Sequence, residues 1–270
     1  MAEVGARRLL PAPDPRARRV VLCYHSVDPS PSDLSLTPEL FDAHLAWLEE
    51  HARVVAFDDL VADPQHTDGS RVAITFDDGY EDNHTHALPL LAARGMPATF
   101  FVTAGFLERD DDVRRHLASI WPGPLRPLSW SQVRELRAAG MGIGSHTWSH
   151  RNLARLDVDE AHEELRRSRA VIEERLGERV AAVAYPWGKL GRSVTDETFV
   201  AARRAGYDLG GISLPRALRG ADDALRIPRF GLGNEPVARL AAKVRGEIDW
   251  HASVHERMPA RVAERLFAHA

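Results

Sequence analysis

The sequence predicts an α/β fold, a distorted (β/α) barrel with seven to eight parallel strands in a single domain. Apolar runs of strand length alternate with helix-like segments along most of the chain. The length of 270 residues suits one such barrel, and neither a composition break nor an internal repeat divides the sequence. An open, doubly wound parallel sheet is the alternative fold.

Eight segments have the length and apolar character of strands that are covered on both faces. Valine, isoleucine, alanine and phenylalanine are common in them, and glycine or proline stops several. In chain order the expected strands are residues 19–27, 54–57, 72–79, 98–103, 141–146, 180–188, 207–213 and 225–230.

Helices are expected between these strands because capping residues mark their ends. Thr37 before Pro38, and Ser129 with Gln132, are N-terminal signals, and Gly177 is a C-cap. The expected helices are residues 37–48, 83–94, 129–139, 157–176 and 195–205, with a short helix and surface excursion in 106–128 and a helix, polar link and helix in 236–270.

Composition restricts the partners. The chain has 35 basic and 39 acidic residues and a net charge of −4, so a nucleic acid or an anionic membrane is not expected and a small neutral or polar ligand is. The single Cys23 excludes an internal disulfide.

Residues 1–18 are expected to form a loose arm without the apolar core of a signal peptide. With no apolar run of transmembrane length, a cytoplasmic protein is expected.

Polar residues stand where the predicted strands end. Active sites of parallel barrels lie at the carboxyl ends of the strands, so side chains from separate strands are expected to converge on one rim. The residues at these ends are His25, Asp77, Asp78, Thr103, His146, Pro186, Trp187 and Arg229.

The pair Asp77 and Asp78 follows the strand at 72–76. Adjacent residues at a strand end project to different sides, so one carboxylate can hold a metal while the other handles a proton. Asp-Asp-Gly is also ordinary turn chemistry. The chain repeats Phe-Asp-Asp at 57–59 without the glycine, where we interpret it as the start of a helix.

His146 and His150 are four residues apart and could chelate one ion if the segment makes a helical turn. The spacing alone is weak, because His251 and His255 repeat it in a polar stretch that we assign to the surface. His146, however, ends a strand on the rim that carries the aspartates. Two imidazoles and one carboxylate leave a metal an open position, where the pKa of bound water falls from 15.7 to about 7.

Three motifs together resemble the polysaccharide deacetylases of carbohydrate esterase family 4, the NodB-homology group. They are Thr75-Phe76-Asp77-Asp78-Gly79, His146-Thr147-Trp148-Ser149-His150 and Ala184-Tyr185-Pro186-Trp187-Gly188, in that order. The resemblance covers roughly residues 19–231, so we expect this barrel to span 19–234 and a helical extension to follow at 235–270. The segments at 24–27 and 227–229 are similar to the exopolysaccharide and poly-N-acetylglucosamine deacetylase subgroup.

The resemblance implies a metal-dependent hydrolase that removes acetyl groups from an N-acetylated sugar or polysaccharide. Asp77 would be the general base, and Asp78, His146 and His150 would hold one divalent metal. Zn²⁺ is the first expectation, with Co²⁺, Mn²⁺, Ni²⁺ and Fe²⁺ as alternatives. A backbone N–H near Trp187 would help to hold the oxyanion.

The third motif leaves two positions open. Tyr185 and Trp187, on either side of Pro186, could line the substrate groove or be core aromatics. Ala184 stands where many members have an arginine that positions the base. Arg229 could replace that arginine, or it could make an ordinary surface ion pair.

The general acid is a further departure, because the Leu-x-His of many members has no clean copy. His25 is offered as the acid or as a substrate contact. Two other functions stay open: the same site acting on a non-sugar amide or a small glycoside intermediate, and a catalytically silent glycan-binding protein. The sequence predicts no oligomeric state.

Overall fold

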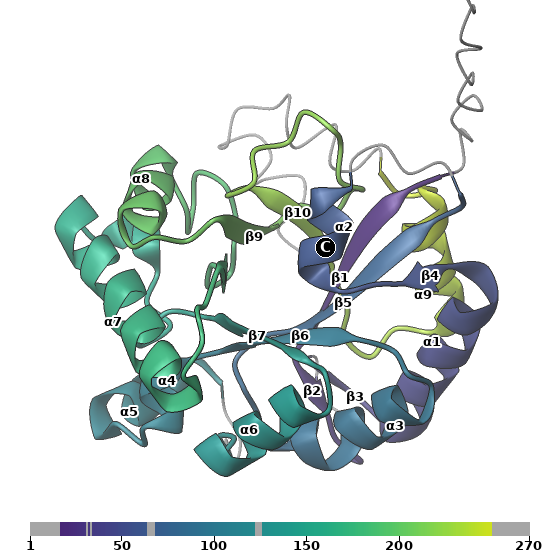
Figure 1. Ribbon diagram of the computed structural model, residues 1–270, viewed down its shortest axis with the longest axis horizontal. Helices are drawn as coiled ribbons and strands as arrows, with labels where there is room; N and C mark the ends of the chain where they lie inside the picture. The colour runs from purple at the N-terminus through teal and green to yellow at the C-terminus, as the bar shows by residue number, and fades with distance from the viewer. Residues whose placement is uncertain (1–16, 31, 33, 64–67, 122–125, 250–270) are drawn as a thin grey trace, which may run out of the picture.

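Seven parallel strands form a closed barrel in the computed structural model, which describes residues 17–30, 32, 34–63, 68–121 and 126–249 (Figure 1). The first strand pairs with both the second and the last strand of the ring, so no edge is left open. This closure confirms the predicted barrel and excludes the open sheet. Around the ring the strands are β1 (Arg19–Tyr24), β5 (Arg71–Phe76), β6 (Ala98–Val102), β7 (Gly142–Ser145), β8 (Ala182–Ala184), β9 (Leu209–Ser213) and β10 (Ile227–Gly231).

The register brings the carboxyl ends of neighbouring strands to one rim. Tyr24 lies opposite Phe76, and Phe76 lies opposite Phe100. Hydrogen bonds continue past the last ladder residues, because the Asp77 N–H donates to the Tyr24 carbonyl over 2.9 Å. The next residues of the chain are therefore held at this rim by backbone pairing.

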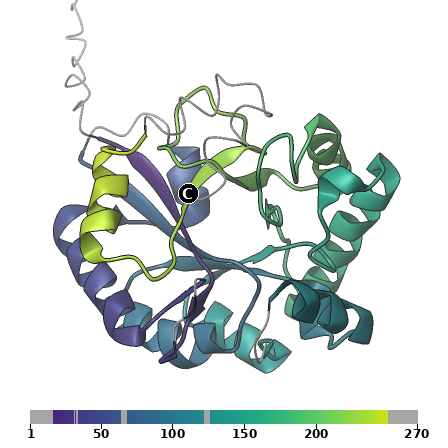
Figure 2. The same ribbon diagram turned by 180° about the vertical axis from the view of Figure 1, so that it is seen from behind.

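Helices surround the barrel (Figures 1 and 2). The predicted caps of these helices are present. The Thr37 hydroxyl accepts from Leu40 N–H, Ser129 and Asp157 each make a capping box, and Gly177 ends its helix with φ 71°. The helices are α1 (Pro38–His51), α2 (Phe57–Ala62), the π-helix η1 (Asn83–Ala87), α3 (Leu88–Ala93), α4 (Ala104–Leu107), α5 (Asp111–Ile120), α6 (Trp130–Ala138), the 3₁₀-helix η2 (Leu153–Arg155), α7 (Val158–Leu176), α8 (Asp196–Arg204) and α9 (Val237–Arg245).

Stacked aromatic rings fill the space between the barrel and α1. Phe76 lies 4.8 Å from Phe100 and 5.5 Å from Tyr24 between ring centroids, and Phe41 meets Phe76 edge-on. All four side chains are fully buried. Burial of each contributes roughly 1.5–3 kcal/mol, so this cluster fixes the strands that carry the site.

Two predicted strands are shorter than expected. Residues 54–57 provide only β4 (Arg53–Val54), which pairs with the first half of β5 outside the ring, and Phe57 already begins α2. The second half of β5 pairs with β6 instead, so no room is left for a longer β4. Residues 180–188 provide only the three residues of β8, because the chain turns away at Tyr185-Pro186-Trp187.

Two differences from the predicted elements occur near the end of the first strand. Its last residues separate as β2 (Ser26–Val27), which pairs with β3 (Ser35–Leu36) in a second sheet. The helix expected at 83–94 begins as the π-helix η1. Both changes surround His25, the residue between β1 and β2.

The two ends of the described chain meet. Arg18 donates to both oxygens of Asp249 over 2.9 and 2.8 Å. The expected domain limits of 1–18, 19–234 and 235–270 stay predictions, and the second helix of the tail and the pair His251 and His255 lie outside the described residues. Within the described residues, no helix combines the length and apolar character that a membrane span requires.

Candidate metal centre and active site

Left-handed backbone conformations gather at the rim. Within the described chain five non-glycine residues have positive φ, and four of them belong to the predicted motifs: Asp78 (74°), Thr147 (66°), His150 (57°) and Trp187 (56°). Such conformations cost about 1–3 kcal/mol each and persist only where the surroundings impose them. The rim loops therefore hold these residues in unfavourable backbone conformations, and these conformations determine where their side chains lie.

Asp78 lies between the two predicted histidines. Its Oδ1 is 3.3 Å from His146 Nε2 and 3.4 Å from His150 Nε2, and all three side chains are at most 3% exposed. Neither Asp78 oxygen has a hydrogen-bond partner of normal geometry within the described chain. A buried carboxylate without such partners is costly, which indicates that a cation belongs here.

The donor set fits a divalent metal of the zinc type. Two imidazole nitrogens and one carboxylate oxygen are the ligands of many catalytic zinc sites. Tetrahedral bonds of 2.0–2.1 Å place ligand atoms about 3.3 Å apart, close to the two separations above. Asp78, His146 and His150 could therefore hold such an ion.

The two imidazoles are oriented by different contacts. His146 Nδ1–H donates to the Ala184 carbonyl over 2.8 Å, which leaves the lone pair of Nε2, on the side of Asp78, for a metal ion. The His150 ring meets Trp187 edge-on at 4.6 Å between centroids. Burial lowers the pKa of His150 to about 4 and would lower that of His146, but Asp77 and Asp78 reverse the direction for His146. His150 is thus neutral, as a metal ligand must be.

The histidines do not meet through a helical turn, which was the condition under which their spacing was expected to allow chelation of one ion. Residues 146–150 form a loop with left-handed backbone at Thr147 and His150. The loop is stabilised locally, because the His150 N–H donates to Thr147 Oγ1 over 3.1 Å. The spacing of four residues therefore brings the rings together by another geometry than the one that motivated it.

Asp77 has a cation of the protein as its partner. Arg229 on β10 donates from Nη1 to Oδ1 and from Nη2 to Oδ2, each over 2.7 Å, and both residues are 3% exposed. Burial alone would raise the pKa of Asp77, but Arg229, with help from His146, lowers it to about 2. A Cβ at Gly211 on β9 would lie 2.8 Å from Arg229 Nε, so a glycine there leaves room for the guanidinium.

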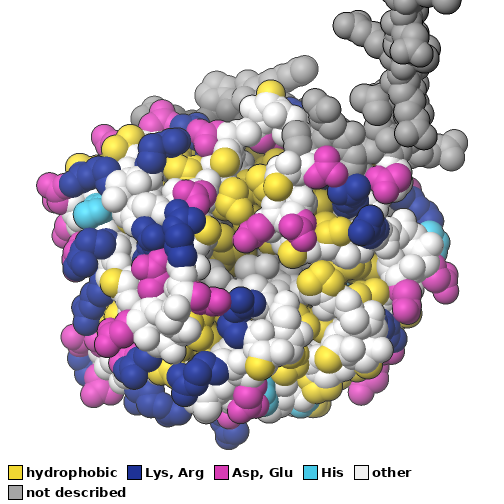
Figure 3. All heavy atoms as spheres, in the orientation of Figure 1, with side chains coloured by type: hydrophobic (Ala, Val, Ile, Leu, Met, Phe, Trp, Pro, Cys, Tyr) yellow, Lys and Arg dark blue, Asp and Glu magenta, His cyan; other side chains and the backbone are white. Residues whose placement is uncertain are grey.

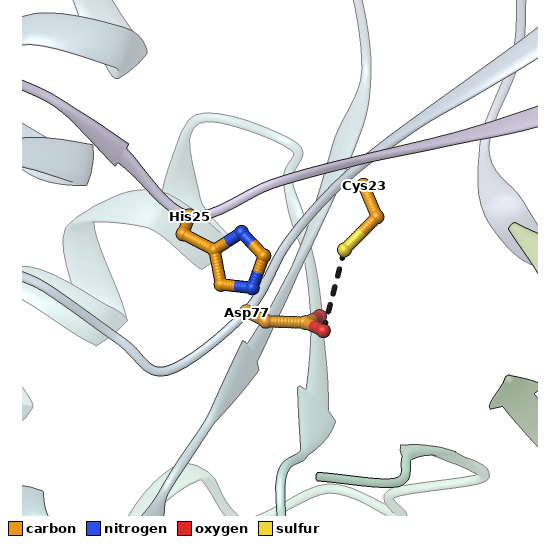
Figure 4. Close-up of side chains that lie close together, drawn as sticks. All are labelled: Cys23, His25 and Asp77. Carbon is orange, nitrogen blue, oxygen red and sulfur yellow. Dashed lines mark hydrogen bonds between the residues drawn. The ribbon is translucent and has the colours of Figure 1, made fainter. Parts of the chain in front are cut away.

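Cys23 and His25 approach Asp77 from β1 and the residue that follows it (Figure 4). Cys23 Sγ lies 3.3 Å from Asp77 Oδ2, and the ligand atoms of the three residues lie within 4.8 Å of one another. Burial above all raises the pKa of the Cys23 thiol well above its usual range, so it is a neutral donor. His25 is half-buried, and its Nδ1 is buried without a hydrogen-bond partner in the described chain.

The backbone of His25 is fixed by η1 and the residue before it. Asn83 Nδ2 donates to the His25 carbonyl over 2.8 Å, and Asp82 accepts from Ser26 Oγ and from the Val27 N–H. The chain after the Asp-Asp-Gly motif thus returns to support the turn that carries His25. Sequence reasoning missed Cys23 and Asn83, and only their proximity to the motifs in the chain could have drawn attention to them.

The residues of the third motif lie in different places: Tyr185 in the core and Trp187 beside the candidate site. Tyr185 is 1% exposed, belongs to the core and meets Phe199 edge-on at 5.5 Å, so it does not line a groove. Pro186 is buried, while Trp187 is half-buried beside His150. A Cβ at Gly188 would lie 2.5 Å from Ser213 N, so only glycine permits this close turn. The structure therefore groups Trp187, but not Tyr185, with the candidate site.

A large part of the sequence is similar to curated proteins of known name. It is 27% identical over 205 residues to YxkH of Bacillus subtilis, which is named after the polysaccharide deacetylases; the match covers 74% of this chain and 66% of that protein. It is 24% identical over 145 residues to the poly-β-1,6-N-acetyl-D-glucosamine N-deacetylase of Escherichia coli K12, covering 51% and 22%. The chain thus spans less than two thirds of these curated relatives.

Solved structures share the fold. The deacetylase PplD of Streptococcus pyogenes, in complex with acetate, matches with a TM-score of 0.72 at 22% identity, over 85% of this chain and 99% of that one. IcaB from Ammonifex degensii matches with a TM-score of 0.70 at 29% identity, over 85% and 97%. The polysaccharide deacetylase family model matches residues 65–210, which are more than half of the sequence. The chain belongs to the polysaccharide deacetylase family, the NodB-homology hydrolases of carbohydrate esterase family 4.

Proposed function

We propose that the protein is a metal-dependent hydrolase that removes acetyl groups from an N-acetylated sugar or polysaccharide. The observation that carries the proposal is the division between two adjacent buried carboxylates. Asp78 lies against two imidazoles, while Asp77 lies against a guanidinium. Family membership and the relatives named above support the substrate class.

Asp78, His146 and His150 would hold the metal. When bound, a divalent ion of the zinc type polarises the acetyl carbonyl and lowers the pKa of water. The ligands would be kept in place by the Ala184 carbonyl behind His146 and by Trp187 against His150. The metal is proposed as Zn²⁺ first, with Co²⁺, Mn²⁺, Ni²⁺ or Fe²⁺ as alternatives.

Asp77 would accept the proton of the attacking water. Arg229 holds this carboxylate ionised and fixes its plane with two hydrogen bonds. Arg229 thus takes the part that Ala184 cannot take. Cys23 donates to Oδ2 from another side and would act as a second positioning residue for the base.

His25 would supply the proton that the leaving amine needs. Water adds its oxygen to the acetyl carbon, the C–N bond breaks, and the products are a free amine and acetic acid, which ionises to acetate. One proton passes from water to Asp77 and another from a ring nitrogen of His25 to the amine nitrogen; Asp77 then gives up its proton and His25 takes one up from solvent. The position of His25 beside Asp77 supports this assignment. The backbone N–H near Trp187 is proposed as a donor to the oxyanion.

The test combines metal analysis with acetate release. The purified chain is expected to contain about one divalent ion and to release acetate from N-acetylglucosamine oligomers. Asp77→Asn should retain the ion and lose turnover by at least about 10³-fold, since it removes the base but no ligand. Full turnover in that variant would remove Asp77 from its role. A bound ion and bound glycan without turnover on any substrate would favour the silent binding protein.

A further inference from the structure

A cavity of about 530 Å³ opens beside the candidate metal centre. Trp187, which packs on the His150 ring, forms one of its walls. His116 also lines the cavity, and its Nε2 lies 3.3 Å from the His150 carbonyl. A ligand in this cavity would therefore lie beside the loop that carries His150. Its size is that of a site for a ligand of one to a few sugar units.

The charges that line the cavity are of one sign. Arg151, Arg155, Lys189 and Arg192 contribute to its walls, and none of the described lining residues is Asp or Glu. Over the face seen in Figure 3, by contrast, basic and acidic side chains are interspersed, in keeping with a net charge of −4. Four cations around one cavity thus differ from the mixture of charges on the face seen in Figure 3.

Three of these cations are available to a ligand. Arg151, Arg155 and Lys189 are exposed, and among the described residues none of them makes an ion pair. The loop that carries Lys189 is held in shape, because its N–H donates to Ser193 Oγ over 2.7 Å and Asn152 Nδ2 donates to the Arg192 carbonyl over 3.2 Å. The cations are therefore presented from a fixed frame, which lowers the entropy cost of binding an anion.

Apolar groups share the cavity with the cations. Ile120, Leu156 and Trp187 line it, and the Trp187 ring is half-buried, so that one part faces the cavity. Sugar rings pack on aromatic and apolar surface, and carboxylates or phosphates pair with Arg and Lys. The two kinds of group in one cavity fit a sugar that carries an anionic substituent.

We infer that the substrate is an acidic N-acetylated glycan, whose carboxylate or phosphate group lies among Arg151, Arg155 and Lys189 while its acetamido group reaches Asp77 and Asp78. The inference rests on the proposed deacetylase function and specifies its substrate class. A neutral polymer would leave these cations without a counter-charge in the complex.

The experiment compares three N-acetylated oligosaccharides of equal length. One is a neutral N-acetylglucosamine oligomer, the second alternates glucuronate with N-acetylglucosamine, and the third carries a phosphate. With the metal-loaded chain we expect kcat/KM for acetate release to be about 10-fold or more higher for an acidic probe, mainly through KM, since the anion lies away from the reacting carbon. This preference should largely vanish in about 1 M salt, where the Debye length is about 3 Å.

Substitutions identify the cations. Arg155→Gln and Lys189→Gln should each lower the ratio of acidic to neutral kcat/KM by about 3- to 10-fold, and Lys189→Glu by more. Arg239→Gln is the matched control, because Arg239 is an exposed cation on α9, outside the cavity. The carboxylate and phosphate probes distinguish the two anions.

Equal kcat/KM for neutral and acidic probes, or the same loss in the Arg239 variant, would overturn the inference and leave the deacetylase function standing. Absence of acetate release from all three probes would overturn the function itself.

Discussion

Asp77 and Asp78 are neighbours in the chain and are equally buried, but the structure treats their charges differently. Asp77 accepts two hydrogen bonds from Arg229 and lies against Cys23. Asp78 has two imidazoles at ion-pair distance and no hydrogen-bond partner of normal geometry in the described chain. Burying an unpaired ion costs several kcal/mol, so each carboxylate needs a cation. The chain provides one for Asp77, and for Asp78 we propose that a bound metal ion provides it.

The comparison predicts that substitution of Asp78 abolishes metal binding and that substitution of Asp77 does not. Asp78→Asn should reduce the bound ion from about one per chain to nearly none and lower kcat/KM by at least about 10³-fold, since a ligand and its charge are lost. In the wild type, metal at 100 times Kd should raise the free energy of unfolding by about 2.7 kcal/mol, and in Asp78→Asn it should not.

Metal analysis and urea unfolding with and without metal measure both effects. Asp59→Asn is the control, because Asp59 belongs to the other Phe-Asp-Asp segment and is exposed in the first turn of α2. A full complement of metal in the Asp78 variant would break the comparison.

His25, which lies beside Asp77, should affect turnover but not metal binding, unlike the histidines beside Asp78. His25→Gln is expected to keep the metal and to lower kcat on an N-acetylated sugar by about 10²- to 10⁴-fold, because the amine must leave without its proton. An activated aryl acetate, whose leaving group needs no proton, should be hydrolysed with a much smaller loss. An equal loss on both substrates would assign His25 to structure or metal retention instead. His84→Gln is the control, because His84 Nε2 hydrogen-bonds Glu135 at the surface, away from the site.

Arg229 offers a test through stability. Arg229→Met should lower the free energy of unfolding by about 3–5 kcal/mol, since it leaves the buried Asp77 carboxylate without its cation. The double variant Asp77→Asn with Arg229→Met should recover part of that loss, because the uncompensated charge is gone. Urea unfolding of the metal-free proteins measures the difference. A double variant no more stable than Arg229→Met would show that the packing of Arg229, rather than the charge of Asp77, matters.

The sequence predicted the barrel because strand signals are local. Apolar runs, caps and glycines after helices are read from a few neighbouring residues, and closure then follows from parallel strands in order. Strand ends near the site were predicted less well. The Tyr185 to Gly188 turn and the left-handed Thr147 and His150 depend on contacts with other strands, and such conformations oppose the local preferences of their residues.

The two Phe-Asp-Asp segments show where sequence reasoning ends. At 57–59 the aspartates lie exposed in the first turn of α2, and at 76–78 they are buried on the barrel rim. The glycine and the strand before Asp77 distinguished them correctly. The partners of the buried pair come from residues about 50 to 150 positions away. Arg229 was offered as a replacement for the motif arginine, but no pattern near Asp77 indicated that Cys23 would touch it.

Substitution of Cys23 gives the smallest predicted effect. It tests the difference between the two carboxylates because Cys23 contacts Asp77. A thiol is a weak donor, and its hydrogen bond to a buried carboxylate is worth about 1 kcal/mol, or roughly 5-fold in rate. Cys23→Ala should therefore lower kcat about 3- to 10-fold with little change in KM or metal content, since the role proposed for Asp77 is to accept the proton and not to bind substrate or metal. Cys23→Ser keeps a donor at the same position and should restore most of the rate. Steady-state kinetics of both variants measure this, and an alanine variant as fast as the serine variant would leave Arg229 as the group that positions the base.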